Sequence, residues 1–199
     1  MDKIKSMREL SKHIHEVRDN HLVELVKLHN KHWKNVDVDN DLEIIEAYNK
    51  LYPLLIDEIF NCLEEVIAST LKTISKLFQI KNNVILDVED LMYDEDGKTL
   101  NDRLYEYYII HKGEKAVYNL TRLMTTEVEY VFSGVMQDKI DIDEYNYFMV
   151  DNLDDVEDCD GACPDVQSIF PINAEKPPYH PDCECFWIAM TNEEVEKRE

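Results

Sequence analysis

Glycine is scarce in this chain, with four residues among 199. A loop that cradles a phosphate needs several closely spaced glycines, so this scarcity argues against a nucleotide-binding site. Few glycines also leave few tight turns, which favours long helices. The sequence contains neither a G-x-S-x-G nor an H-E-x-x-H motif, so the signatures of two common hydrolase classes are missing. We therefore expect a protein that is not an enzyme.

Long apolar runs are also missing, although 44% of the residues are hydrophobic and 32% are charged. Charged residues interrupt the apolar stretches every three or four positions. The N-terminus, Met1-Asp-Lys-Ile-Lys, leads into a helical pattern without the apolar core of a signal peptide. The sequence therefore predicts a globular protein without a membrane span, made and kept in the cytoplasm.

Basic residues are the third shortage. The chain has 21 Lys and Arg against 43 Asp and Glu, which gives a net charge of −22 and a pI near 4.6. Such a surface repels a phosphate backbone, so we expect no direct nucleic-acid binding. The segment from Asp151 to Asp165 carries seven acids and no base. It is interpreted as a solvated face, with docking to a basic partner and mimicry of DNA charge as the alternatives.

The first part of the chain, residues 1–80, has a helical pattern. Apolar residues recur every three or four positions from Ser6 to Phe78, with a polar break at residues 36–41. Asp41 is the predicted N-cap of the second helix, and Pro53 predicts a kink or a fresh start within it. Cys62 is interpreted as a small core residue. Five histidines lie among polar neighbours on these helices, and no metal site is expected from them: His13, His15, His21, His29 and His32. His29 and His32 lie one turn apart, but no cysteine or carboxylate stands one turn before or after them to complete a ligand set.

The second part, residues 81–199, has a mixed pattern. Val84-Ile85-Leu86 suggests a short apolar segment after a turn, and Thr99 with Asp102 predicts a capping box at the start of a helix. A further helix is expected over 115–136. Strands are expected over 145–150 and 185–190, with a possible third over 168–172. The predicted fold class is α+β: a mostly helical N-terminal part followed by a small α+β C-terminal domain with a Cys/His cluster.

This cluster consists of four cysteines and one histidine within 27 residues: Cys159, Cys163, His180, Cys183 and Cys185. Zinc prefers thiolate and imidazole ligands in a closed tetrahedral shell, and it would stabilise a segment that has little core of its own. Structural zinc is the first hypothesis, bound by the first four residues with Cys185 as the replacement ligand. Reduced thiols in a packed loop and disulfides are the alternatives.

A catalytic metal is the weaker interpretation of the same cluster. It requires an open coordination position and a general base nearby, and Glu184 and Asp182 are the two candidates for that base. Outside the cluster, Glu127 is expected to face solvent or cap a helix. Arg103 is expected to pair with Asp94, Glu95 or Asp96 in a structural contact.

The second half of the chain carries a series of short motifs in a fixed order: Asp96-Gly97-Lys98-Thr99-Leu100, Arg103-Leu104, Thr125-Thr126-Glu127, Cys159, Cys163-Pro164, Phe170-Pro171, Pro177-Pro178, His180-Pro181 and Cys183-Glu184-Cys185. Together they resemble the phage head morphogenesis family, the minor head proteins of tailed phages. The likeness covers residues 90 to 190, about half of the chain. In Cys183-Glu184-Cys185 the chain has glutamate where the family usually has arginine.

The resemblance implies a virion protein, present in few copies, that associates with the phage portal or capsid protein during head assembly in the host cytoplasm. It also implies an influence on DNA packaging or ejection. The alternative from another class is an acidic inhibitor that mimics DNA charge and blocks a nucleic-acid-binding enzyme. That alternative gives no reason for the cysteine cluster.

Overall fold

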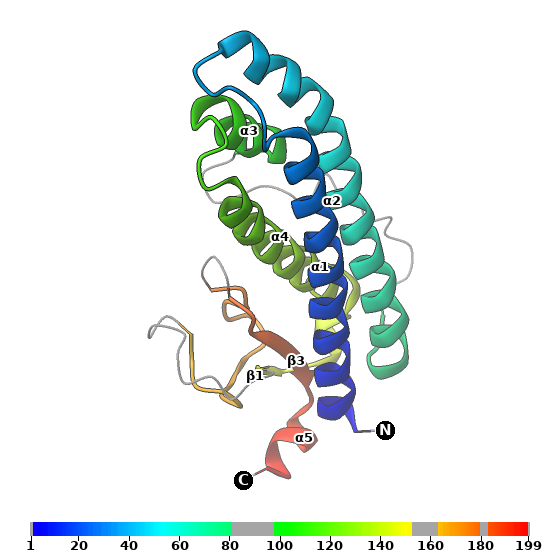
Figure 1. Cartoon of the computed structure of the whole chain (residues 1–199). Helices are drawn as coiled ribbons and strands as arrows, with labels where there is room; N and C mark the ends of the chain where they lie inside the picture. Colours follow the sequence, from blue (N-terminus) through cyan, green and yellow to red (C-terminus); the bar gives the residue numbers. More distant parts are fainter. Residues whose placement is uncertain (1, 81–97, 153–162, 180–182, 199) are drawn as a thin grey trace.

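Three long helices lie side by side, and a small sheet covers one end of them in the computed structural model of the chain (Figure 1). Both ends of the chain lie at the end that carries the sheet, where Nζ of Lys3 is 2.7 Å from a carboxylate oxygen of Glu194. The α+β prediction is therefore confirmed. The structure describes residues 2–80, 98–152, 163–179 and 183–198.

Helices α1 (Lys3–His32) and α2 (Asp41–Leu77) form an antiparallel pair. The expected N-cap of α2 is wrong by one residue, because Asp41 is already the first residue of the helix. Asn40 caps it: its backbone is extended, and its side-chain oxygen accepts a hydrogen bond from the amide of Glu43. A residue in helical conformation cannot place its side chain back over the first free amides, so the extended residue takes the cap.

Pro53 lies inside α2 and does not start a new helix, because the helix runs without interruption from Asp41 to Leu77. Proline removes one intrahelical hydrogen bond. Leu51 and Leu55 on either side of it are fully buried, as are Cys62 and Leu63 further along. Burial of this long apolar face holds the helix together across the proline. The core position expected for Cys62 is confirmed.

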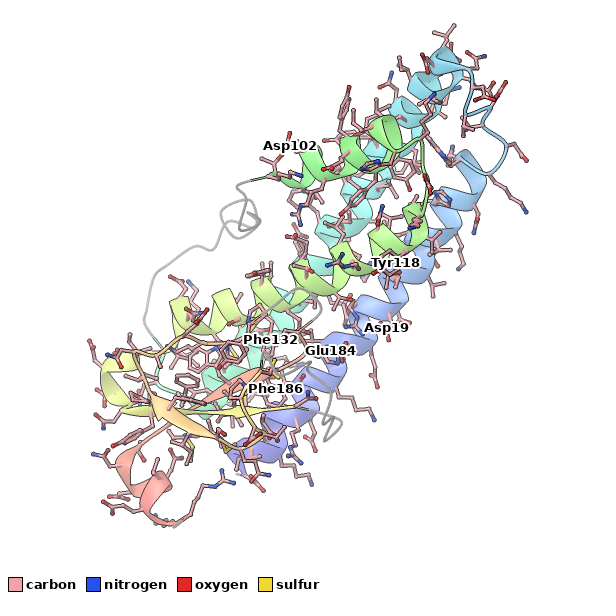
Figure 2. The ribbon with its side chains drawn as sticks, turned by 90° about the vertical axis from the view of Figure 1, so that its left-hand side faces the viewer. Asp19, Asp102, Tyr118, Phe132, Glu184 and Phe186 are labelled. Carbon is pink, nitrogen blue, oxygen red and sulfur yellow. The ribbon has the colours of Figure 1, made fainter. Side chains whose placement is uncertain are left out.

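Helix α4 (Ala116–Lys139) is the third long helix and packs against both α1 and α2. It confirms the helix expected over 115–136 and extends it by one turn. Most of its side chains are buried, since helices cover one side of it and the sheet covers another. Figure 2 shows Phe132 of α4 and Phe186 of the sheet in the layer between them. No helix in the described part of the chain is long and apolar enough to cross a bilayer.

A short helical segment precedes α4. It consists of α3 (Leu100–Tyr105) and the π-helical turn η2 (Glu106–Ile110). The capping box is present as expected: the amide of Asp102 donates to the Thr99 hydroxyl at 3.2 Å, and the amide of Thr99 donates to the Asp102 carboxylate at 2.9 Å. The apolar segment expected at residues 84–86 lies outside the described residues.

The sheet has three antiparallel strands in the order β2-β1-β3. The central strand β1 (Tyr147–Asp151) pairs with β2 (Ile169–Pro171) on one side and with β3 (Phe186–Met190) on the other. All three confirm the expected strands. Every residue of β3 is buried, because the strand lies between β1 and helix α1. Two short helices complete the fold, η3 (Ile142–Glu144) before β1 and α5 (Asn192–Glu196) after β3.

One hydrophobic core runs through the helices and the sheet. Met7 and Ile14 of α1, Phe148 of β1 and Trp187 of β3 all belong to it, and each is fully buried. The domain boundary predicted between residues 80 and 81 coincides with the end of the first described range. Described residues before and after this boundary belong to one hydrophobic core, which positions the cysteines.

Candidate metal centre

The sheet brings three of the cysteines together. β2 and β3 are both antiparallel to β1, so they run parallel to each other, and both begin at the end of the sheet where β1 ends. Cys163 precedes β2, whereas Cys183 and Cys185 immediately precede β3. The three side chains consequently meet beyond the C-terminal end of β1, although 20 residues separate Cys163 from Cys183.

The sulfur geometry suits a metal ion. Sγ of Cys163 is 3.6 Å from Sγ of Cys183, and all three sulfur atoms lie within 4.8 Å of one another. Tetrahedral zinc with Zn–S bonds of about 2.3 Å separates its sulfur ligands by roughly 3.8 Å. Cys183 and Cys185 are free thiols. These three cysteines are therefore a group that could hold a metal ion.

The environment of the thiols favours one thiolate. Cys183 and Cys185 are buried and Cys163 is half-buried. A hydrogen bond from the Cys185 thiol lowers the pKa of Cys183 to about 5, and the same bond together with burial raises the pKa of Cys185. Burial, together with the negative charges of Glu65 and Glu58, raises the pKa of Cys62 to about 12, so that this thiol stays protonated in the core. A thiolate is the form that binds metal.

The five predicted ligands are placed as follows. Cys163, Cys183 and Cys185 lie together, so Cys185, expected only as a replacement, takes part in the group. Cys159 and His180 lie outside the described residues. Within the described ranges, no second group of three His, Cys, Asp or Glu side chains has this geometry.

Glu184 projects from the cysteine segment onto helix α1. One of its carboxylate oxygens lies 2.6 Å from Nη1 of Arg18, which is largely buried and also contacts Asp19 (Figure 2). A carboxylate held in an ion pair is stabilised in its charged form and has little freedom to turn toward a metal-bound water. Glu184 is therefore better placed to anchor the cysteine segment than to act as a general base. Asp182, the other candidate base, lies outside the described residues.

One expectation about a charged residue outside the cysteine cluster is corrected. Glu127 is buried and does not face solvent, because α4 turns it inward, where it forms an ion pair with Nη1 of Arg103 on α3. The expected partners of Arg103, Asp94 to Asp96, lie outside the described residues. Nε and Nη2 of Arg103 are buried without a hydrogen-bond partner among the described residues, so Glu127 is the main compensation for this buried charge.

Sequence reasoning missed this ion pair, although a signal for it exists. Glu127 stands one turn from Leu123, Met124 and Val131 on the apolar stripe of α4, and all three are buried. A charged residue in the middle of such a stripe faces the core and requires a partner of opposite charge.

Two histidines of α1 pair with carboxylates of neighbouring helices. Nε2 of His15 is 2.9 Å from Oε1 of Glu129 on α4, and Nδ1 of His21 is 2.7 Å from Oε1 of Glu58 on α2. Burial lowers the pKa of His15, but the hydrogen bond and charge of Glu129 outweigh burial and raise the pKa above its usual 6.5. These histidines link helices.

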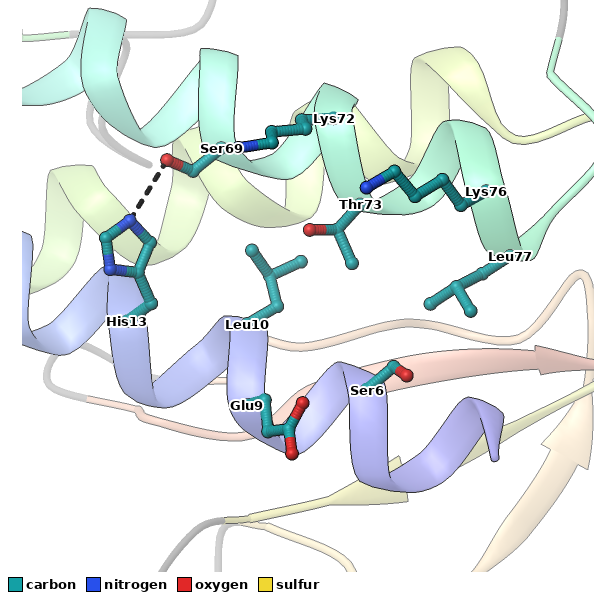
Figure 3. A pocket seen from close by; sticks show the side chains of 9 residues that line it. All are labelled: Ser6, Glu9, Leu10, His13, Ser69, Lys72, Thr73, Lys76 and Leu77. Carbon is teal, nitrogen blue, oxygen red and sulfur yellow. Dashed lines mark hydrogen bonds between the residues drawn. The ribbon is translucent and has the colours of Figure 1, made fainter. Parts of the chain in front are cut away.

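A groove of about 290 Å³ lies between the start of α1 and the end of α2 (Figure 3). In it, Nε2 of His13 lies 3.3 Å from the hydroxyl of Ser69. A nucleophilic serine needs a histidine that a third group orients, and no described carboxylate forms a hydrogen bond or ion pair with His13. The groove therefore offers no nucleophilic site.

Comparisons with known proteins find no match to this chain among protein-family models, curated proteins or solved structures. The cysteine group and its ion-paired surroundings are consequently the features on which a function must be argued.

Proposed function

We propose that this protein is a minor structural protein of a tailed-phage head, which associates with the portal or capsid protein during head assembly. The observation that carries the proposal is the way in which separate motif segments meet. Arg103 contacts Glu127, and the cysteine before β2 meets the two before β3. The hydroxyl of Ser133, six residues after Glu127, donates to the carbonyl of Pro177.

This convergence supports the proposal because the segments that carry the family resemblance form contacts with one another. A chance likeness of short motifs would have no reason to join its parts in one structural unit. The links are also ones that hold a fold together, namely a buried ion pair, a buried hydrogen bond and a group of thiols. They fit a protein whose role is to assemble.

We further propose that the cysteine group binds one structural zinc ion. Cys163, Cys183 and Cys185 supply three thiolates, and Cys159 or His180 would supply the fourth ligand. Strand β2 has only three residues, and none of them is fully buried, so the segment around it has little core of its own. Zinc would tie this segment to the start of β3 and contribute folding free energy.

Quantitative mass spectrometry of density-purified phage particles tests the assembly role. We expect a small, reproducible number of copies of this chain relative to the portal and major capsid proteins. Absence from otherwise complete particles would overturn the virion role and favour the acidic inhibitor that mimics DNA.

Native mass spectrometry of the purified protein tests the zinc ion. We expect one zinc per chain, lost in Cys183→Ser and kept in Cys62→Ser, since Cys62 is buried in α2 away from the group. A metal-free chain in zinc-containing buffer, or a mass lowered by the hydrogens of a disulfide, would overturn this part of the proposal.

A further inference from the structure

Exposed apolar side chains are concentrated at the end of the helices that lies far from the sheet. Among the described residues, nine large hydrophobic side chains are exposed. Five of them lie where α1 turns into α2 and where α3 and η2 cover that turn (Figure 1). These five, each 43% to 66% exposed, form what we term the distal apolar patch: Val38, Leu42, Ile45, Tyr105 and Ile110.

Two members of the distal apolar patch line one hollow, and a third packs near an aromatic ring of α2. Val38 and Ile110 line the same open hollow of about 710 Å³, and the buried indole of Trp33 lines it as well. On the other side, the ring of Tyr105 lies 6.2 Å from the ring of Tyr48, which stands one turn after Ile45 on α2. The patch therefore flanks a hollow, the form that receives a protruding side chain.

The fold itself does not use this surface. The first turns of α2 already bury Ile44, Ala47 and Leu51 on the inner side, and yet Leu42 and Ile45 are apolar on the outer side. A helix that is apolar on both faces is usually covered on both faces. A contiguous exposed apolar surface of this kind marks an interaction site.

The charged residues around the distal apolar patch indicate which kind of partner it can bind. Residues 36–47 carry five acids and no base, and Asp37, Asp39 and Glu46 are exposed beside the apolar side chains. The base Lys112 neutralises one of the five, because its ammonium lies 3.2 Å from Asp41. Lys34 adds one positive charge on the α1 side of the hollow. The α2 side of the patch therefore remains acidic.

A second copy of this chain would bring the same acids face to face across a two-fold axis, at a net charge of −22 per chain. An anionic membrane would be repelled for the same reason. We propose that the distal apolar patch docks a partner protein whose contact face has an apolar centre and a rim of Lys and Arg. This inference rests on the proposed function, in which the partner is a portal or capsid protein of the same head.

The test compares copy numbers in purified phage heads for three forms of the chain: wild type, Leu42→Ser/Ile45→Ser and Val23→Ser. Val23 is a matched control, because it is 53% exposed on α1 outside the patch. We expect Val23→Ser to match wild type and the double variant to fall about 10-fold or more, since two apolar contacts are lost. Equal thermal unfolding midpoints would show that the double variant is folded.

A photo-crosslinking amino acid at position 42 identifies the occupant. We expect a crosslink to a portal or capsid protein at a peptide flanked by Lys or Arg, weakened by Asp39→Lys/Glu46→Lys. A crosslink to a second copy of this chain, or a double variant incorporated at the wild-type copy number, would overturn the docking surface and leave the assembly role intact. Absence of the wild-type chain from heads would overturn both proposals.

Discussion

The carboxylate of Glu184 accepts a hydrogen bond of 2.6 Å from Nη1 of Arg18, a residue 166 positions earlier in the chain. Glu184 stands between Cys183 and Cys185, so this contact fastens the cysteine segment to helix α1. Groups that orient a ligand segment contribute to metal affinity even though they do not touch the metal. Arg18 is therefore a positioning residue for the candidate metal centre.

Replacing Arg18 with alanine should weaken zinc binding by about 10-fold, because the segment that presents Cys183 and Cys185 loses its anchor. Competition with a zinc chelator measures this change. Arg18→Lys should retain part of the affinity, since a lysine keeps the charge but not the fork of donors. Lys27→Ala, which removes an exposed ion pair with Glu24 on the same helix, should bind as wild type does. Wild-type affinity in Arg18→Ala would contradict the positioning role.

The buried ion pair between Arg103 and Glu127 should be costly to break on one side only. Both side chains are less than one tenth exposed, so Arg103→Met removes the cation that faces the buried Glu127 carboxylate and should lower the free energy of unfolding by about 3–5 kcal/mol. Urea denaturation measures this loss. The double variant Arg103→Met/Glu127→Leu should lose less than the sum of the single variants. Strict additivity would show that the two residues act independently.

The pair of His15 and Glu129 should make stability depend on pH. The pKa of His15 in the folded protein is raised above 6.5, so its stabilising contribution is complete below that pH and is lost as pH rises through the folded pKa. Burial raises the pKa of Glu129 as well, so the contribution of this carboxyl to stability is also lost as pH rises. The free energy of unfolding of wild type minus that of His15→Gln should therefore shrink between pH 6 and pH 8.

The pKa of His29 shifts in the opposite direction to that of His15. Burial lowers its pKa, so its contribution increases as pH rises through its unfolded pKa. Both proteins contain His29, and the difference between them isolates His15. A difference that stays constant or grows with pH would refute the assignment.

Gly113 should not accept a side chain. Its φ is +72°, and a β-carbon there would lie 2.0 Å from Nε1 of the buried Trp33. Gly113→Ala should therefore lower the free energy of unfolding by about 3 kcal/mol, measured by urea denaturation. Lys115 in the same turn has a φ of +55°. Lys115→Gly should be neutral or stabilising, because glycine adopts this conformation without strain; a neutral Gly113→Ala would show that the indole can move aside.

Much of the fold could be predicted because it depends on local patterns. The apolar stripe of residues 6–78, the capping box at Thr99 and the apolar strands around Phe148 and Ile188 are all readable from spacing and residue type. One prediction failed where neighbouring structure outweighed a local preference. Of the two outcomes predicted for Pro53, a kink or a fresh start, the fresh start does not occur, because the helix runs on through the proline where buried leucines flank it.

The candidate site was predicted in composition but not in arrangement. The cysteines are conspicuous in the sequence. Three of them meet because β2 and β3 start at the same end of the sheet. The partners of Arg103 and Glu184 come from α4 and α1, far away in the chain. No spacing rule links residues that only the packing of helices brings together.

The helices, the strands, the acidic surface and the number of thiols follow from the amino-acid order, because periodicity, charge and residue type act locally. The packing of the folded chain places Cys185 beside Cys163 and Cys183, buries Glu127 against Arg103 and leaves five apolar side chains exposed at the far end of the helices. Those outcomes depend on which surfaces meet when the core forms, and burial changes the energy of a charge or an apolar group only once its neighbours are in place.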